Sequence, residues 1–366
     1  MLNLKRTPLY EAHVALGAKM VDFGGWEMPV QYSGIVAEHH AVRNEAGLFD
    51  VSHMGEFIVK GPEALNVLHK LLTADFSKQK IGQCMYAIMC YPTGGAVDDL
   101  IVYKMDEDEY MLVVNAGNKD KDFDWITEHM QGFKAELVDQ SDETGLVALQ
   151  GPKSVAILQP LTDISLDSLK PYWFAKGKVL GKDCLVSRTG YTGEEGFEVY
   201  CAAADTALIW DGILKEGEGV VLPAGLGARD SLRFEAKMPL YGHELDENIT
   251  PLEAGLGRFV ALDREDDFIG KEALAKQKAE GLSRRIRGFE MVGRGIARAE
   301  YPVKKDGVVI GHVTSGMPAP TVGKNLGNVL INQEFSEVGT EFDVEIRGKD
   351  IKAVIIKTPF LKKEAK

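Results

Sequence analysis

The sequence predicts an α+β protein that ends in a small all-β domain. Between residues 145 and 217, strand-like apolar runs alternate with helical stretches, which is typical of a sheet covered by helices on one side. Beyond residue 287 the helical stretches end, and short strand-like runs follow one another across turns that mostly contain glycine. Such spacing predicts a separate β domain. A chain of 366 residues is also long for one core and favours two or three domains.

The first elements are predicted from apolar periodicity and from helix-start residues. Residues 34–46 place apolar side chains on one helical face. Gly61-Pro62-Glu63-Ala64 puts proline and glutamate in the first turn of the next helix, which is expected to run through Leu72. The other elements expected in this part are a helical start at 7–11, an aromatic loop at 21–29 and a strand at 56–60.

An antiparallel meander is predicted around Asp98. Residues 85–91 and 110–115 are rich in β-branched, aromatic and other apolar side chains, and Gly94-Gly95 indicates a turn between strands. Because successive side chains of a strand point to opposite faces, Asp98 and Asp99 cannot share a pocket. One of them is expected to face inward and the other to face solvent or a turn amide. From this stretch alone a capping role for both stays open, since aspartate is common in turns.

The later elements follow from the same signals. A helix is expected at 119–130, a strand at 145–150 and a helix that starts at Gly151. A strand at 184–188 leads into a glycine-rich bend at 189–198. Residues 204–217 and the segment that starts at Gly225 predict further helices, and 273–287 predict an exposed helix with a linker. The strands expected in the β domain are 288–292, 301–303, 308–314, 328–331, 341–347 and 351–356.

Composition excludes several classes of function. The net charge of -13 argues against a nucleic-acid partner, which is usually bound by clustered lysine and arginine. No apolar run approaches the roughly 20 residues that cross a bilayer, so no membrane is expected. The 4 cysteines lack a C-x-x-C spacing and are interpreted as reduced core thiols, and the histidines give no metal-binding pattern. The first residues lack a signal-peptide core, and a cytoplasmic location is expected.

The pair Ser52-His53 invites comparison with a serine nucleophile and its base. No G-x-S-x-G elbow is present, and adjacent residues of an extended chain point their side chains to opposite sides. His53 is therefore predicted to be a structural, hydrogen-bonding residue.

Short motifs occur in a fixed order along nearly the whole chain. They are Asp22-Phe23-Gly24-Gly25-Trp26, Phe49-Asp50-Val51-Ser52-His53-Met54, Gly94-Gly95-Ala96-Val97-Asp98-Asp99-Leu100, Thr189-Gly190-Tyr191-Thr192-Gly193-Glu194, Gly227-Ala228-Arg229-Asp230 and Thr314-Ser315-Gly316. Taken together, they resemble the aminomethyltransferase family, the T-protein of the glycine cleavage system. Each motif alone is a weak signal, and their common order makes the resemblance specific.

The resemblance implies a three-domain cloverleaf of the folate-binding aminomethyltransferase type. An α+β folate-binding domain would comprise residues 1–50 and 135–245. An antiparallel-sheet domain carrying the central aspartate would comprise 51–134 and 246–280, and a C-terminal β-barrel-like domain 281–366. The implied reaction transfers the methylene of the aminomethyl-dihydrolipoyl arm of H-protein to tetrahydrofolate and releases ammonia. H-protein is the implied partner, the other system proteins would bind transiently, and the chain is expected to be a monomer.

Transferred residue by residue, the resemblance implies that Asp98 is catalytic. Glu198 would accept the paired ring NH and amino donors of the pterin, and Arg229 would reach the pterin carbonyl or a folate carboxylate. A strand-edge role for Glu198 and an ion pair between Arg229 and Asp230 are the structural alternatives. The remaining residues implied to line the cofactor pocket are Tyr191, Tyr86, Tyr172, Met54 and Asn115. The chain departs from the family pattern at Arg258 and Phe360.

The chemistry accounts for a fixed carboxylate. Positive charge develops on the one-carbon unit as the sulfur leaves and the folate nitrogen attacks, and a preorganised anion stabilises that charge. Two alternative functions stay open within the same resemblance. One is that of a folate-dependent demethylase relative, and the other is that of a non-catalytic folate-binding assembly factor for iron-sulfur proteins. The assembly factors carry a cysteine motif, where this chain has Lys237-Met238-Pro239-Leu240. The demethylases usually carry an added flavin domain, for which 366 residues leave no room.

Overall fold

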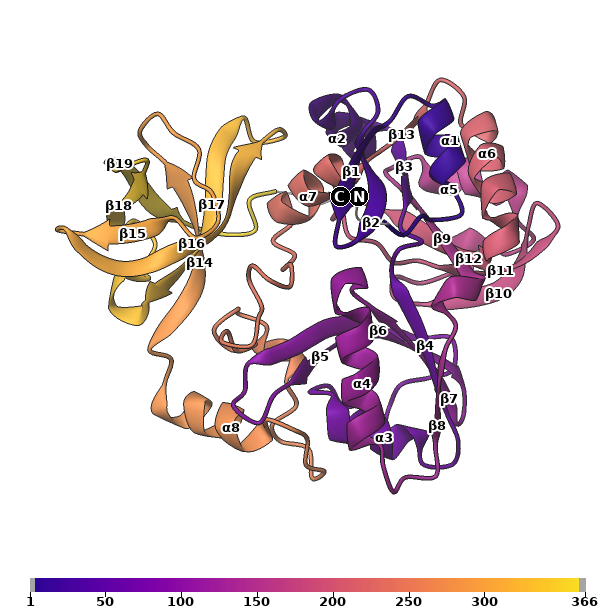
Figure 1. Cartoon of the computed structure of the whole chain (residues 1–366), viewed down its shortest axis with the longest axis horizontal. Helices are drawn as coiled ribbons and strands as arrows, with labels where there is room; N and C mark the ends of the chain where they lie inside the picture. Colours follow the sequence, from indigo (N-terminus) through magenta and orange to yellow (C-terminus); the bar gives the residue numbers. More distant parts are fainter. Residues whose placement is uncertain (1–3, 362–366) are drawn as a thin grey trace. The chain divides into compact units, whose positions relative to one another are not determined.

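The computed structural model describes residues 4–361 and divides into two compact units. The first unit comprises the chain up to Leu68, Phe76–Tyr86 and Leu100–Leu232. The second comprises His69–Asp75, Ala87–Asp99 and the chain from Arg233 onward. Helices and sheets are mixed throughout the first unit, and strands dominate the end of the second, so the predicted α+β class is confirmed (Figure 1).

A six-stranded sheet forms the centre of the first unit, with strand order β10-β11-β12-β9-β3-β13. Its pairs are antiparallel except that β13 runs parallel to β3. The side chains of one face pack under helices α1, α5 and α6 around the buried Trp210, as the alternation of strands and helices predicts. The bounds are β3 Ala46–Asp50, β9 Thr144–Gln150, β10 Phe174–Val179, β11 Lys182–Ser187, β12 Gly196–Ala202, β13 Val221–Pro223, α1 Tyr10–Ala15, α5 Ser154–Leu158 and α6 Thr206–Glu216.

A second sheet has the strand order β5-β6-β7-β4-β8 and contains the predicted meander. Within the first unit, its residues Ile58, Tyr103 and Met111 form one apolar core with Leu185 and Tyr200 of the six-stranded sheet. Two sheets thus bury their facing sides against each other, which is the layered packing expected for strands with one apolar face. The bounds are β4 Gly55–Lys60, β5 Cys84–Cys90, β6 Ala96–Asp106, β7 Glu109–Val114, β8 Glu136–Asp139, α3 Ala64–Leu71 and α4 Lys119–His129.

Residues 21–29, predicted to form an aromatic loop, instead form most of a two-stranded sheet. Strands β1 (Lys19–Phe23) and β2 (Trp26–Gln31) are antiparallel, with Phe23 opposite Trp26. The two residues between them, Gly24 and Gly25, have φ values of 57° and 87°. A two-residue turn with positive φ at both positions matches the twist of an antiparallel pair, so the glycines allow the hairpin that the aromatic residues obscured.

A buried polar network anchors this N-terminal segment to strand β3. Asp50 accepts hydrogen bonds from Thr7 Oγ1 at 2.6 Å and from Ser52 N at 2.9 Å, and its Oδ2 is 2.8 Å from His13 Nε2. Tyr32 OH is 2.8 Å from His13 Nδ1. Burial alone would raise the pKa of Asp50, but the contacts with His13, Thr7 and Ser52 hold it below its ordinary value.

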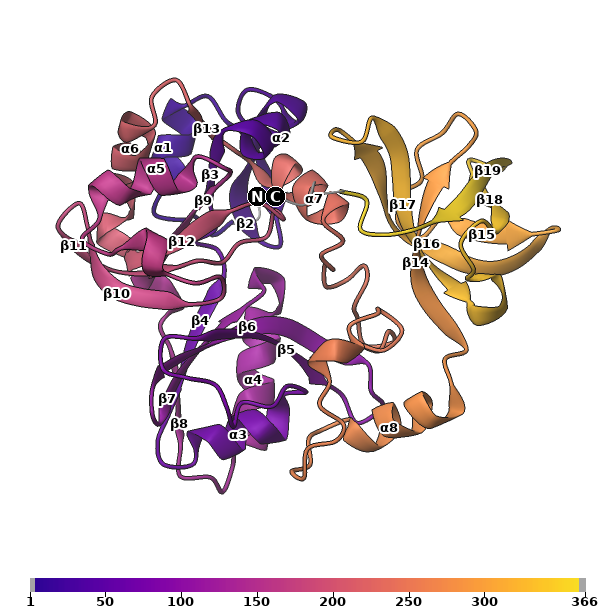
Figure 2. The ribbon, with the colours of Figure 1, turned by 180° about the vertical axis from the view of Figure 1, so that it is seen from behind.

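The second unit ends in a closed antiparallel barrel, β14-β17-β16-β15-β18-β19, which confirms the predicted C-terminal β domain (Figure 2). Alternate side chains of its strands point inward and form a core that includes Phe289, Val329 and Phe342. The bounds are β14 Arg284–Met291, β15 Pro302–Lys305, β16 Val308–Ala319, β17 Lys324–Asn332, β18 Glu341–Ile346 and β19 Lys349–Ile356. Helix α8 (Lys271–Glu280) precedes the barrel, close to the helix predicted there.

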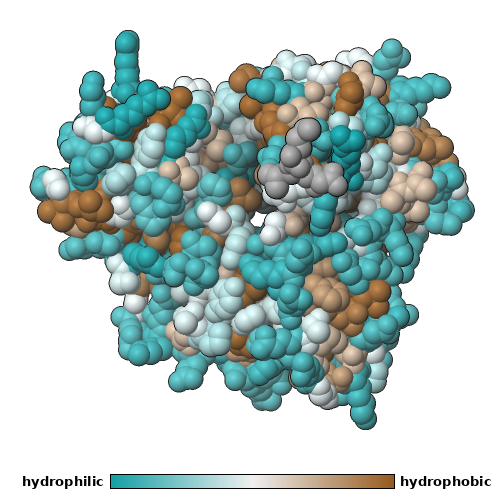
Figure 3. Space-filling view, in the orientation of Figure 1, coloured by the Kyte–Doolittle hydropathy of each residue, from teal (hydrophilic) through white to brown (hydrophobic). Residues whose placement is uncertain are grey.

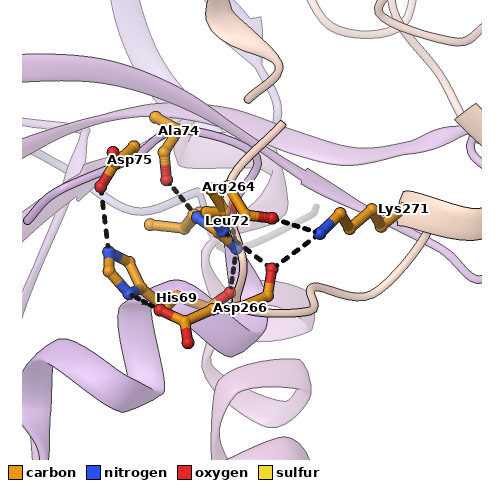
Figure 4. Close-up of polar contacts among 7 residues, drawn as sticks. All are labelled: His69, Leu72, Ala74, Asp75, Arg264, Asp266 and Lys271. Carbon is orange, nitrogen blue, oxygen red and sulfur yellow. Dashed lines mark hydrogen bonds and ion pairs between the residues drawn. The ribbon is translucent and has the colours of Figure 1, made fainter. Parts of the chain in front are cut away.

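Arg264 holds the segment before α8 to the end of α3 within the second unit. Its Nη atoms donate to the carbonyl oxygens of His69, Leu72 and Ala74, and Lys271 bonds the carbonyl oxygens of Arg264 and Asp266 (Figure 4). His69 lies in the last turn of α3, whose carbonyls have no partner inside the helix, and Leu72 and Ala74 follow that helix, so the guanidinium satisfies a helix-end carbonyl and two carbonyls of the segment after it.

The visible face of the molecule is mostly hydrophilic, with scattered apolar residues (Figure 3). Within residues 4–361, no helix has the length and apolar character needed to cross a membrane. The same residues contain no group of three or more histidine, cysteine or acidic side chains placed to hold a metal ion.

Candidate functional site

The glycine-rich bend between Thr189 and Glu198 is organised around the side chain of Gln150. Gln150 Nε2 donates to Thr189 O at 3.1 Å, and its Oε1 accepts from Thr192 Oγ1 at 2.8 Å. A Cβ at Gly190 would lie 2.0 Å from Gln150 Oε1, and one at Gly196 would lie 2.3 Å from Nε2. The two glycines are therefore required because the bend folds directly onto the amide. This packing fixes the segment that carries Tyr191 and leads into Glu198.

Glu198 lies on β12, only 9% exposed, where it faces the second sheet of the first unit. Thr189 Oγ1 donates to Glu198 Oε2 at 2.5 Å, and no other described residue hydrogen-bonds this carboxylate. Burial raises the pKa of Glu198, while the Thr189 bond and the charge of Arg229 oppose that rise. The carboxylate is thus buried and positioned, and its Oε1 is available to a ligand donor. This arrangement differs from the solvated strand-edge alternative.

Arg229 lies in helix α7 (Leu226–Glu235) and stacks on an aromatic ring. Its guanidinium carbon is 4.7 Å from the centroid of Tyr191. Among residues 4–361 it has no ion pair and no side-chain hydrogen bond, so the predicted alternative of a pair with Asp230 is not observed. Burial lowers the pKa of Arg229, and Tyr191 and Glu198 oppose the shift. A cation–π contact leaves the in-plane N–H donors of the guanidinium available to a ligand.

The other predicted lining residues all lie in the first unit, on different elements. Met54 follows β3 and packs against the core between the two sheets. Tyr172 is 45% exposed, and its carbonyl accepts from Cys84 N at 2.7 Å, which brings its backbone beside β5, the strand that carries Tyr86. Asn115 follows β7 and directly precedes a short 3-10 helix. Their roles in binding stay predictions.

Asp98 lies on β6, in the part of that strand that belongs to the second unit. It is fully buried, whereas Asp99 is partly exposed. Both faces of the strand are buried in part, since Leu100 and Val102 share the face of Asp98, while Val97 and Tyr103, which are fully buried, share the face of Asp99. The two carboxylates therefore lie on opposite faces of β6, as predicted, and Asp98 is the more buried of the two.

His53 is buried in the first unit, with its ring edge-on to Phe23 at 5.6 Å between centroids. Its Nδ1 has no hydrogen-bond partner among the described residues, which differs from the hydrogen-bonding role predicted for it. Burial lowers the pKa of His53 to about 4, so the ring is neutral near pH 7.

Several residues that shape the site were missed at the sequence level. Gln150 and Tyr200 lie in no recognisable motif, and Thr189 belongs to the motif Thr189–Glu194 without a predicted role. Each acts through a partner distant in sequence: Gln150 bonds Thr189 across 39 positions, and Tyr200 bonds Tyr103 across 97. The repeated glycines of the bend were the one available signal for these residues. A buried bend with repeated glycines implies that a side chain packs closely against it.

Two departures from the family pattern have simple structural settings in the second unit. The Arg258 guanidinium lies over the ring of its neighbour Phe259, at 4.5 Å from the centroid. Phe360 packs on Phe234 with ring centroids 5.0 Å apart. Both side chains therefore stack on aromatic rings.

Comparison with known proteins agrees with this geometry. Residues 9–264 match the family model of the GCVT N-terminal domain, and residues 284–362 match that of the glycine cleavage T-protein C-terminal barrel domain. The chain is 54% identical to an aminomethyltransferase of Moorella thermoacetica over 100% of both chains. It is 53% identical to an aminomethyltransferase of Bacillus velezensis, covering 98% of this chain and 99% of that one.

A solved structure is also similar, the glycine cleavage system aminomethyltransferase T of Bartonella henselae. Its TM-score is 0.92 at 34% identity, with 98% of each chain covered. The resemblance drawn from the short motifs is thus confirmed over the full length of the chain. The protein belongs to the aminomethyltransferase family, the T-proteins of the glycine cleavage system.

Proposed function

We propose that this protein is a tetrahydrofolate-dependent aminomethyltransferase that acts on the lipoyl arm of H-protein. It takes the arm's S-aminomethyl group, transfers the methylene to tetrahydrofolate, and releases ammonia and the reduced arm. One carbon–sulfur and one carbon–nitrogen bond break, and two carbon–nitrogen bonds to folate form. The observation that carries the proposal is the combination, in the first unit, of a buried carboxylate, Glu198, with an arginine, Arg229. Among residues 4–361, one oxygen of Glu198 has no hydrogen-bond partner and Arg229 has no ion pair.

The donor set in the first unit fits a reduced pterin. Glu198 Oε1 can accept hydrogen bonds from adjacent ring NH and amino donors, because an ionised carboxylate only accepts hydrogen bonds. Arg229 can donate to a carbonyl or carboxylate, and its guanidinium lies over the ring of Tyr191. Tyr86, Tyr172, Met54 and Asn115 offer aromatic, apolar and amide surface, which is the usual lining of a site for a flat heterocycle.

Asp98 is the proposed catalytic group. Tetrahydrofolate, when bound, supplies the nucleophilic nitrogen that receives the carbon. The Asp98 carboxylate orients that nitrogen and stabilises the positive charge that develops on the transferred carbon. A carboxylate held in place on a strand reorganises little during the reaction, which suits this role.

The partners follow from the same proposal. H-protein delivers the aminomethyl group, and the other proteins of the system bind transiently, with this chain as a monomer. The reaction is placed in the cytoplasm. All four cysteines are buried free thiols, which agrees with a reducing compartment.

The direct test measures ammonia from H-protein loaded with an aminomethyl group. Purified protein should release ammonia in proportion to the loaded arm, and only when tetrahydrofolate is present. Product analysis should recover an equal amount of 5,10-methylenetetrahydrofolate. Ammonia release that is independent of the protein would contradict the proposal, as would tetrahydrofolate binding without turnover.

A further inference from the structure

A continuous chain of hydroxyl groups leads to Glu198 through the core of the first unit. Thr189 Oγ1, which bonds Glu198 Oε2, is 2.6 Å from Ser187 Oγ. Tyr103 OH is 3.2 Å from Ser187 Oγ and 3.4 Å from Thr189 Oγ1. Tyr200 OH is 2.8 Å from Tyr103 OH. Each of these side chains is at most 6% exposed, so the chain is shielded from water.

The two sheets of the first unit build this chain from register and strand alternation. Ser187 on β11 is directly opposite Glu198 on β12, and Tyr200 is two residues beyond Glu198 on the same face. Tyr103 comes from β6 in the facing sheet and meets Tyr200 with ring centroids 5.5 Å apart. The hydroxyls are therefore aligned by the same packing that forms the core.

The hydrogen bonds in this series of hydroxyl groups all run in one direction when Glu198 is ionised. A hydroxyl has a single proton, and that of Thr189 points to Glu198 Oε2. Ser187 then donates to Thr189, Tyr103 donates to Ser187, and Tyr200 donates to Tyr103. Hydrogen bonds in such a series polarise one another in a low-dielectric interior. The strength of the last bond, on Oε2, thus depends on the hydroxyls behind it.

We propose that four side chains are positioning residues for ligand recognition: Tyr200, Tyr103, Ser187 and Thr189. They act as one directed series of hydrogen-bond donors that holds Oε2 of Glu198 and leaves Oε1 for the ligand. The inference rests on the proposed function, since it takes the ligand to be tetrahydrofolate. It assigns separate tasks to the two oxygens of one carboxylate. It also accounts for two tyrosines in a core where phenylalanine would bury the same ring without a polar group.

The electrostatic surroundings agree with this assignment. Besides Thr189 and Arg229, the titratable groups that interact with Glu198 are Glu56 on β4, Cys84 on β5, Tyr103 and Tyr200. Burial raises the pKa of Glu56 well above its ordinary value, which favours the neutral form of this carboxyl. Thr189 and Arg229 are then the groups that favour the ionised form of Glu198.

The test compares Thr189→Val, which keeps the side-chain shape without the hydroxyl, with Thr189→Ser, which keeps the hydroxyl. The measurement is the dissociation constant of tetrahydrofolate between pH 5 and 8. Only ionised Glu198 accepts both pterin donors, so affinity falls as pH decreases through its pKa. Thr189→Val raises that pKa. The acid limb of the profile, which is the pH range over which affinity falls, should therefore move up by about one pH unit, equivalent to about 1.4 kcal/mol. Thr189→Ser should follow the wild type.

The tyrosines provide the second comparison. Tyr103→Phe interrupts the series and should move the acid limb in the same direction by a smaller amount. Tyr110→Phe is the matched control, because Tyr110 is also fully buried and its hydroxyl has no partner among the described residues. It should leave the limb in place.

The outcomes separate the two proposals. Weaker binding of Thr189→Val without a moved limb would overturn the positioning role and leave the proposed function intact. So would a limb that moves equally in Thr189→Ser, or in Tyr110→Phe. Absence of tetrahydrofolate binding by the wild-type protein would contradict the proposed function itself, and the inference with it.

Discussion

Replacing Gln150 by leucine tests whether one amide holds the bend that carries the ligand contacts. Leucine is close to glutamine in size but has no polar group. The change removes two hydrogen bonds and leaves Thr189 O and Thr192 Oγ1 without those partners, in residues that are 6% and 1% exposed. Each lost bond costs about 1 kcal/mol, and each buried group left unsatisfied costs about 1–3 kcal/mol. Since these terms overlap, we expect a loss of about 2–5 kcal/mol in the free energy of unfolding.

The assay is urea unfolding followed by tryptophan fluorescence, with tetrahydrofolate affinity measured on the folded variant. Affinity should fall as well, because the bend that positions Tyr191 and Glu198 loses its support. The control is Gln131→Leu, the same chemical change at an exposed position, which should alter stability by less than about 0.5 kcal/mol. A Gln150→Leu protein whose free energy of unfolding is within about 1 kcal/mol of the wild type would refute the account of the bend, because that difference corresponds to a single hydrogen bond at most.

Two further predictions concern stability. Asp50→Asn breaks the buried network around His13 and should cost about 3–5 kcal/mol near pH 7. Because the pKa of Asp50 is lowered in the folded state, this stabilisation is present above the unfolded pKa of about 4 and is lost as pH falls through the folded pKa. The difference between variant and wild type in urea titrations should therefore shrink only in acid, and a difference that vanishes above pH 5 would contradict the assignment. Arg264→Leu removes the donors to three carbonyl oxygens at the end of α3 and should cost about 1–3 kcal/mol. Hydrogen exchange of amides in residues 69–75 should quicken, and unchanged exchange there would show that Arg264 has no anchoring role.

The predictable part of the fold is the part specified by local pattern. The barrel strands and the meander follow from short apolar runs between glycine turns, and the placement of Asp98 and Asp99 on opposite faces of a strand follows from strand alternation alone. The hairpin at 19–31 was missed because its aromatic residues suggested a loop, while the turn depended on positive φ at Gly24 and Gly25. Local propensity carries no information on such a turn until the two strands are paired.

The predictable part of the site is the set of residues that could contact a ligand directly. Glu198 and Arg229 were identified through motifs, and the structure adds why they are available: one oxygen of Glu198 is held by Thr189, and Arg229 stacks on Tyr191. The supporting residues were out of reach because their partners are distant in sequence. A tyrosine such as Tyr103 has the pattern of an ordinary core residue until the facing sheet is in place.

The central claim is that the buried carboxylate of the Asp98-Asp99 pair performs the transfer. The most direct measurement compares ammonia release by Asp98→Asn and Asp99→Asn with loaded H-protein and tetrahydrofolate, alongside tetrahydrofolate affinity. Loss of a preorganised charge at a reacting centre typically costs about 10²–10³-fold in turnover. Asp98→Asn should lose activity by about that factor with near-normal affinity, and Asp99→Asn should stay close to the wild type. Normal turnover by Asp98→Asn, or an equal loss in both variants, would contradict the account.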